Sequence, residues 1–391
     1  MTDMQTAALP LDHTPEADFV AIVDFGGDGA RVGVKDTIDI AGYPSRAGSR
    51  ALENTPAAAR NADVVDALLN AGCRIVGKTN MHELAFGVTG VNLWTGTPRN
   101  PLFPDYVPGG SSSGSATAVA GGRVDFALGT DTGGSVRTPA ACCGVFGLKP
   151  TFGRISRRGV APGKTSLDCV GVFTRDTDML ARAMAILEPG FNVPSLDAPP
   201  RVGLVAVEAR PEIADLVRDA FAGTDAVIEN MKLPGLEAAF HAGIAIIGSE
   251  TAAAFGPLLA SGKVGSDVAA RIKAGGEVSP TALAAAEQVR AAFTAEVDAL
   301  LARVDVLALP TLPDYPPTLA EATDAVKAVP MTRLVRQFNM SGHPAISVPL
   351  RDPGHRPVGL QLVGRKGDDE HLCAVAAYIA ARSSLILHDN A

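Results

Sequence analysis

Apolar positions along the chain fall into two patterns that predict different elements. Short apolar runs bounded by glycine, proline or charged residues predict buried strands, and they lie at 19–24, 32–34, 124–128, 202–207, 304–309, 345–350 and 358–363. Runs in which apolar residues recur every three to four positions predict helices, and these lie at 61–70, 177–187 and 369–381. In the first of these helices, Asn61 is the expected N-cap and Gly72 the residue that ends it. The chain therefore mixes strands and helices along its length.

The stretch 109–139 combines glycines and serines in a pattern typical of an active site. Its glycines, which let the backbone turn sharply or approach a ligand closely, stand at 109, 110, 114, 133 and 134. The small, apolar run 115–120 predicts a closely packed buried helix, which places Ser111 at the N-terminus of that helix. Ser135 follows the predicted strand 124–128 on a turn whose N–H groups have no partner in a sheet. Such a turn is a natural anion hole.

Composition and charge exclude several classes of protein. The chain has 391 residues, of which 47% are hydrophobic and 19% charged. These values fit an ordinary globular protein of roughly two to three domains, or of one large α/β domain. A net charge of −8 without a basic stripe argues against a nucleic-acid partner. The chain begins without the features of a secretory signal, and no run of about 18 apolar residues predicts a membrane span, so we expect a cytoplasmic protein with no membrane partner.

The five cysteines do not form a recognisable framework. Cys142 and Cys143 are adjacent and the others are scattered, which fits neither a disulfide pattern nor the spacing of a metal site. We therefore expect buried, reduced thiols and no bound metal.

Two short motifs match known patterns by letter but not by context. Residues 72–79 read G-x-x-x-x-G-K-T, the pattern of a phosphate-binding loop, yet a helix precedes Gly72 and residues 74–76 are predicted to be the strand itself. Residues 110–114 read G-x-S-x-G around Ser112, but a nucleophile elbow needs a strand directly before it, and here a loop precedes it. We therefore expect neither nucleotide binding nor an α/β-hydrolase nucleophile.

Several blocks of the sequence, in order, resemble those of the amidase signature family. The blocks are Val34-Lys35-Asp36, Gly77 to Met81, Gly109-Gly110-Ser111-Ser112 followed by Gly129 to Ser135, Pro344 to Pro349, and Pro357 to Gln361. The resemblance covers most of the chain, and the run Gly96 to Pro101 is also similar to compact members such as plant indole-3-acetamide hydrolases; malonamidase is another compact member. It implies a single α/β domain in which helices cover both faces of a large, twisted, mixed sheet. We assign residues 19–391 to this domain and expect residues 1–18 to be poorly ordered.

The resemblance implies a catalytic triad of Lys35, Ser111 and Ser135. Ser135 would be the nucleophile, Ser111 a serine in a cis peptide that passes the proton, and Lys35 the base at the far end of the relay. A lysine can act as a base only if burial lowers its pKa from about 10.4. No cofactor or metal is implied. The oxyanion hole would be formed by the backbone N–H groups of Thr132, Gly133, Gly134 and Ser135.

Other residues of these blocks have more than one interpretation. Lys78 competes with Lys35 for the role of base, although the family places its catalytic lysine in the block around Lys35. Asp131 and Arg137 are expected to form an ion pair that braces the turn, and Arg137 has the alternative of binding a substrate carboxylate. The remaining candidates for substrate binding are Gly109 and Gly110.

The resemblance predicts an amidohydrolase that cleaves the C–N bond of a small carboxamide through an acyl-enzyme and releases ammonia or an amine. Aliphatic or carboxylate-bearing amides rank above arylacetamides, because aromatic residues make up only 5% of the chain. One alternative is an amidotransferase subunit that delivers ammonia to a partner. Another is a non-catalytic binding protein on the same scaffold. The expected partner is a small-molecule amide, and a homodimer is allowed.

Overall fold

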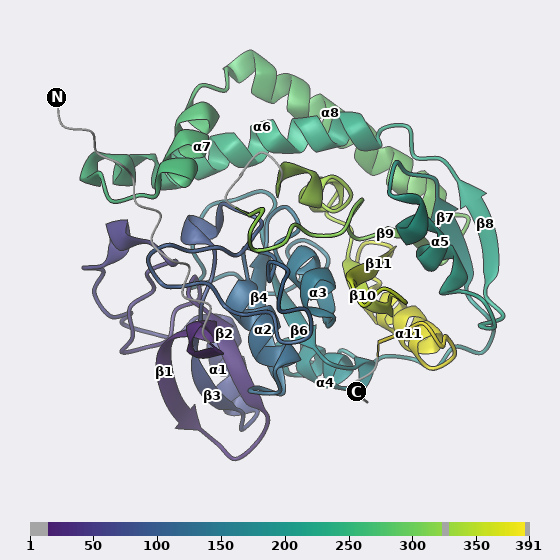
Figure 1. Ribbon diagram of the computed structural model, residues 1–391, viewed down its shortest axis with the longest axis horizontal. Coiled ribbons are helices and arrows are strands. Elements are labelled where there is room, and N and C mark those ends of the chain that lie inside the picture. The colour runs from purple at the N-terminus through teal and green to yellow at the C-terminus, as the bar shows by residue number, and fades with distance from the viewer. Residues whose placement is uncertain (1–14, 323–327, 388–391) are drawn as a thin grey trace.

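The computed structural model describes residues 15–322 and 328–387, and Figure 1 draws them as a ribbon. The strands in these ranges are β1 (Phe19–Gly26), β2 (Arg31–Lys35), β3 (Arg74–Thr79), β4 (Phe126–Asp131), β5 (Phe146–Lys149), β6 (Cys169–Thr174), β7 (Arg201–Val205), β8 (Val227–Met231), β9 (Val306–Pro310), β10 (Ala345–Arg351) and β11 (Pro357–Val363). Each strand expected from the apolar runs is present, with ends that differ by a few residues.

The α-helices of the same ranges are α1 (Asp63–Asn70), α2 (Ser113–Ala120), α3 (Arg137–Cys143), α4 (Thr177–Leu187), α5 (Pro211–Asp219), α6 (Leu236–Phe255), α7 (Ser266–Gly276), α8 (Pro280–Leu301), α10 (Gln337–Met340) and α11 (Asp369–Ala380). Short 3-10 helices are η1 (Pro15–Asp18), η2 (Arg50–Leu52), η3 (Glu83–Ala85), η4 (Gly256–Ser261) and η5 (Val329–Thr332). The helix expected at 177–187 has the predicted bounds.

The described strands form one mixed sheet. Its eleven strands run in the order β1-β3-β2-β4-β6-β5-β10-β11-β9-β7-β8. β2 pairs in parallel with β3 and β4, and β7 pairs in parallel with β8 and β9, whereas the other neighbours are antiparallel. The expected α/β class with a mixed sheet is confirmed. Since β2 has a strand on each side, a side chain at its end is enclosed within the domain.

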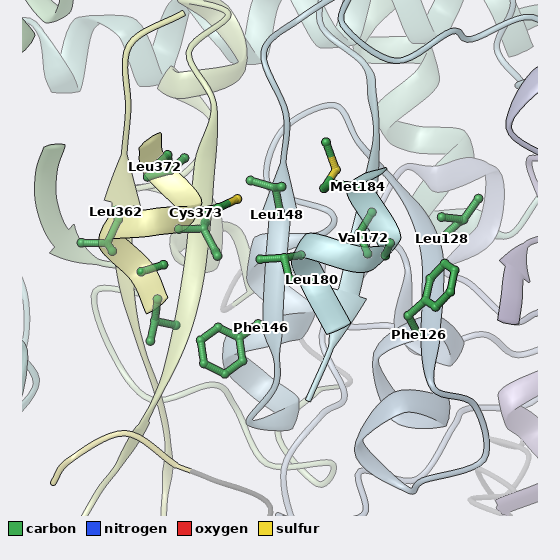
Figure 2. Packing of buried hydrophobic residues seen from close by; sticks show 14 of the residues in the cluster. Phe126, Leu128, Phe146, Leu148, Val172, Leu180, Met184, Leu362, Leu372 and Cys373 are labelled. Atoms are coloured by element: carbon green, nitrogen blue, oxygen red, sulfur yellow. The ribbon is translucent and has the colours of Figure 1, made fainter. Parts of the chain in front are cut away.

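Apolar side chains fill both faces of this sheet. On β9, Val306 joins one cluster of buried residues and Leu307 the other, because successive side chains of a strand point to opposite faces. The first cluster packs against α1, α4, α5 and α11, and Figure 2 shows Leu180 of α4 against strands β4, β5 and β6. α2, α3, α6 and α8 supply the buried residues of the other face. Helices therefore cover both faces, as expected.

Helix α6 is unusually long and apolar. The segment Leu236–Ser261 has a mean hydropathy of 1.4, so by length and composition it could cross a membrane, which differs from the expectation that no such run exists. One such helix is weak evidence for a membrane span. In Figure 1, α6 runs alongside α7 and α8, and it packs against both. It also buries Phe240 and Ile246 within the domain, as the core helix of a globular protein does.

Two local features differ from the sequence expectations. Helix α1 begins at Asp63 with Ala62 as its N-cap, because the Asn61 side chain instead accepts the N–H of Ala41 at 2.7 Å. Of the segment expected to be poorly ordered, residues 1–14 lie outside the described ranges. The remaining four residues form η1, in which Asp18 is buried. They therefore belong to the folded domain.

Candidate active site

Ser135 lies in the tight turn between β4 and α3, which we call the catalytic turn (residues 132–136). β4 is buried along its whole length and ends at Asp131, whose carboxylate accepts the N–H groups of Gly134 at 2.7 Å and Val136 at 3.1 Å. Gly134 has a φ of +115°, which L side chains rarely adopt, so glycine is required there. The turn therefore folds around the Asp131 carboxylate and leaves Ser135 9% exposed.

Ser111 lies in the loop before α2, beside the catalytic turn. Gly109 has a φ of +75°, and the Gly110–Ser111 peptide bond is cis, as the family resemblance implies. The Ser112 N–H donates to the Ser135 carbonyl at 3.3 Å. The loops that carry the two proposed catalytic serines are therefore joined by a backbone hydrogen bond.

Lys35 is the last residue of β2 and reaches the Ser111 loop. Its Nζ donates to Ser111 Oγ at 2.8 Å and to Thr130 Oγ1 at 2.9 Å, and the side chain is fully buried. Burial lowers the pKa of Lys35 to about 7, while the charges of Asp168 and Asp131 act in the opposite direction. A large share of the amine is therefore uncharged at neutral pH, as a base must be.

The second contact of the proposed relay is open in this structure. Ser111 Oγ is bonded to Lys35, but the Ser135 hydroxyl has no hydrogen-bond partner among the described residues. Catalytic hydrogen bonds are often long before substrate binds and tighten afterwards. The Lys35–Ser111 contact is thus part of the structure, and the Ser111–Ser135 contact stays a prediction.

The expected oxyanion hole loses one of its four donors. The Gly134 N–H is donated to Asp131 Oδ1 at 2.7 Å, so it cannot also bind an oxyanion. In the described part of the chain, the N–H groups of Thr132, Gly133 and Ser135 make no hydrogen bond. We therefore leave Gly134 out of the proposed hole and keep the other three.

Arg137 braces the catalytic turn and is closed to substrate. Nε and Nη2 donate to the two oxygens of Asp131 at 3.0 and 2.9 Å, and the side chain is fully buried. The other hydrogens of the guanidinium have acceptors too, namely Val335 O, Gln361 Oε1 and Asn339 Oδ1. Burial alone would raise the pKa of Asp131, but Arg137 holds it well below its usual range. The substrate-binding alternative for Arg137 does not fit, because no donor is left for a substrate.

Gly109 and Gly110 are packing positions rather than parts of an open pocket. A Cβ on Gly109 would lie 2.7 Å from Pro139 Cα, and one on Gly110 would lie 2.8 Å from the backbone nitrogen of Gly90. Both glycines are buried. Their small size is explained by close backbone approach, and the substrate-binding role suggested for them finds no support in these contacts.

The Asp131–Arg137 pair predicts a large effect on stability. Arg137→Met would leave the Asp131 carboxylate buried without its cation, so we expect the free energy of unfolding to fall by about 3–5 kcal/mol, measured by urea denaturation. Arg333→Met is the matched control, because Arg333 pairs with Glu208 and Glu237 at the surface, where a lost pair changes the free energy of unfolding by about 1 kcal/mol or less. Equal losses in the two variants would contradict the bracing role.

Lys78, the competing candidate base, is occupied elsewhere. Its Nζ lies 3.2 Å from Asp36 Oδ1 and donates to Ser45 Oγ at 2.7 Å. Residues 74–79 form β3 instead of a phosphate-binding loop, as the sequence context predicts. These contacts favour Lys35 over Lys78 as the base.

A small cavity lies beside the catalytic turn. Its volume is about 30 Å³, and its lining consists of Thr132, the η3 region (Leu84, Ala85, Phe86), Pro162, Thr165 and one face of α6 (Ile247, Glu250, Thr251, Phe255). No sequence motif marks the α6 residues. They reach the cavity only through tertiary packing of a helix from the middle of the chain, so sequence patterns carry no local signal for them.

Asp168 is a buried carboxylate near Lys35 that the sequence motifs did not single out. It accepts hydrogen bonds from Thr132 Oγ1 and from Arg157 Nη2, both at 2.9 Å. Burial raises the pKa of Asp168, whereas Arg157 and Lys35 lower it. An acidic residue directly before the fully buried strand β6 is the signal that could have identified it.

Comparison with known proteins identifies the class to which this fold and site belong. A family model described as Amidase matches residues 28–202 and 217–373. The chain therefore belongs to the amidase signature family, as the resemblance of its sequence blocks predicts.

Similar proteins carry two kinds of name. The chain is 34% identical to the A-type chain of the glutamyl-tRNA(Gln) amidotransferase from Methanospirillum hungatei JF-1, over 91% of this chain and 93% of the relative. It is 32% identical to Amidase 1 of Arabidopsis thaliana, over 90% of this chain and 93% of the relative. A crystal structure of an amidase superposes with a TM-score of 0.82 at 33% identity, covering 91% of this chain and 85% of that one. Family membership thus supports an amidase or a related enzyme and leaves the reaction to be argued from the site.

Proposed function

We propose that this protein is an amidohydrolase that cleaves a small carboxamide through an acyl-enzyme on Ser135. The observation that carries the proposal is the fully buried Lys35, whose Nζ lies 2.8 Å from Ser111 Oγ in a loop that is hydrogen-bonded to Ser135. Burying a lysine among hydroxyl groups is costly, and such perturbed groups cluster at functional sites. A desolvated amine beside a serine pair is the arrangement that acyl transfer needs.

The proposed reaction moves one proton along the triad. Ser135 Oγ attacks the amide carbonyl while its proton passes to Ser111, whose own proton passes to the neutral amine of Lys35. The N–H groups of the catalytic turn stabilise the oxyanion of the tetrahedral intermediate. The proton then returns to the leaving nitrogen, so that ammonia or an amine departs, and water hydrolyses the acyl-enzyme by the reverse relay.

The pKa of Lys35 predicts the pH profile of this reaction. The protonated lysine cannot accept a proton, so kcat/KM is expected to rise about tenfold per pH unit below about pH 7 and to level off above it. Ammonia release from an uncharged amide, followed from about pH 5 to about pH 10, measures the profile. A rate that does not change with pH across this range would argue against Lys35 as the base.

Ammonia release from a panel of primary amides and small ureides tests the function itself. A turnover above the uncatalysed rate, together with labelling of Ser135 by a fluorophosphonate probe, is the expected result. Binding of amides without any turnover would instead support a non-catalytic binding protein. If neither turnover nor labelling is found, the amidohydrolase proposal fails.

Membership of an amidotransferase complex is the second candidate function, and the names of similar proteins favour it. The similar protein from Methanospirillum hungatei JF-1 is named as one chain of a glutamyl-tRNA(Gln) amidotransferase. A protein of this kind would be recovered from native lysate with stoichiometric partner chains. A protein that is purified alone and turns over amides without partners supports the hydrolase.

The remaining parts of the proposal concern location and partners. All five cysteines are free and buried, which fits the cytoplasm that we propose as the site of action. The triad needs no cofactor for the steps above. Self-association into a homodimer stays a prediction, which light scattering of the purified protein would test.

A further inference from the structure

Arg336, the residue before α10, lies between helix α6 and the catalytic turn. Its Nε is 3.4 Å from the position that a Cβ on Gly133 would take. Its guanidinium stacks over the ring of Phe240 at 5.0 Å from the ring centroid, and a Cβ on Gly243 would lie 2.9 Å from Arg336 Cδ. The same side of Gly133 also meets Ile247 of the cavity wall. The charge of Arg336 is therefore beside a proposed oxyanion donor.

The guanidinium of Arg336 has no anionic partner. No carboxylate lies within 4.0 Å of it in the described ranges, and its Nε is buried without an acceptor. Nη2 donates to Thr332 Oγ1 at 2.8 Å, whereas Nη1 makes no hydrogen bond with a described residue and is not among the buried atoms. Burial lowers the pKa of Arg336 to about 10, so the group is still charged at neutral pH.

This arrangement contrasts with that of Arg137, the fully buried arginine of the catalytic turn. Every N–H of Arg137 has an acceptor, and its charge is balanced by Asp131. A partly buried arginine without a counter-ion is costly unless something else supplies the negative charge. Bidentate pairing with a carboxylate is what a guanidinium does best.

We propose that Arg336 binds a carboxylate of the substrate, and that the substrate class is therefore amides that carry a carboxylate. This inference rests on the amidohydrolase function proposed above and names the substrate of that site. The carboxylate would face the accessible Nη1 while the amide carbonyl lies at the N–H groups of Gly133 and Ser135. Stacking on Phe240 holds the plane of the guanidinium before substrate arrives.

Charge along α6 gives such a substrate its direction. Phe240 and Gly243 seat Arg336 near the start of the helix, whereas Glu250 lines the cavity farther along the same helix. A carboxylate is repelled by Glu250 and attracted by Arg336. Both charges therefore place the anionic end of the substrate at the Arg336 end of α6.

Matched pairs of amides test the assignment. Malonamate and propionamide differ mainly by a carboxylate in place of a methyl group, as do succinamate and butyramide. We expect the wild type to prefer the anionic member of a pair, and Arg336→Met to lower kcat/KM for that member by about 10- to 100-fold, the loss typical of a hydrogen bond to a charged group. The neutral member should change by about threefold or less, and Arg336→Lys should restore part of the loss.

Binding provides a readout that does not depend on turnover. Calorimetry is expected to detect malonate or succinate binding to wild type and to Arg333→Met, and to lose it in Arg336→Met, while the thermal unfolding of each variant shows that it is folded. Turnover of amides with no preference for anions, or equal losses for both members of a pair, overturns the role of Arg336 and leaves the amidohydrolase intact. Dicarboxylate binding that needs Arg336, without turnover of any amide, supports the anion site and sinks the proposed reaction.

Discussion

Ser135→Ala is expected to reduce kcat for amide hydrolysis by at least about 10⁴-fold, because without the hydroxyl no acyl-enzyme can form. Residual turnover would come from binding and from the backbone N–H groups of the catalytic turn, which the substitution leaves in place. Ser135 is 9% exposed, and its hydroxyl has no hydrogen-bond partner among the described residues, so the free energy of unfolding should hardly change. Ammonia release and urea denaturation of the same preparation measure both quantities.

Ser113→Ala is the matched control for this variant. The Ser113 hydroxyl is buried near the same loops, and it too lacks a partner in the described part of the chain. Its removal should leave kcat within about twofold of the wild type, since it belongs to no step of the relay. Comparable losses in Ser113→Ala and Ser135→Ala would show that the site is merely sensitive to packing, and wild-type turnover by Ser135→Ala would refute the nucleophile.

Lys35→Met is the second variant with a large expected effect. General-base catalysis contributes about 10²- to 10⁴-fold, so kcat/KM should fall by that amount and lose its rise toward pH 7. Stability should not fall, because the variant removes a buried amine whose charged form the site disfavours. Initial rates across pH, and the midpoint of urea denaturation, test the two parts separately.

Lys78→Met provides the opposite signature at a second buried lysine. Lys78 pairs with Asp36, and removing it would leave that carboxylate buried without a cation, at a cost of about 3–5 kcal/mol in the free energy of unfolding. The folded fraction should retain kcat. A Lys78→Met protein that stays stable but loses the pH dependence would move the role of base from Lys35 to Lys78.

The family resemblance identified residues that local patterns alone could not. A lysine at the end of a predicted strand is usually solvated, and nothing in the run 31–35 says that strands will lie on both sides of it. Only the order β3-β2-β4 encloses Lys35 and brings it to Ser111, whose loop begins 74 residues later in the chain. Strands β5, β6 and β8 were not predicted as strands, since their registers depend on partners far away in the sequence.

Roles that depend on individual hydrogen bonds were also beyond the sequence. The motif predicts a cradle of N–H groups in the catalytic turn, but the carboxylate of Asp131 takes the one from Gly134. The same motif suggested Arg137 for a substrate carboxylate, while Arg336 carries the unpaired charge, some two hundred residues further along. Arg336 lies outside every quoted block, and its value comes from what surrounds it in space.

Helix α6 acts as a gauge for substrate length. Seven residues separate Gly243, which touches Arg336, from Glu250, and two helical turns of this size span about 10 Å. A molecule as short as succinamate is shorter than that interval, so it cannot meet both charges at once. Only a longer amide, with a negative group at one end and a positive or N–H-rich group at the other, would fill the whole face.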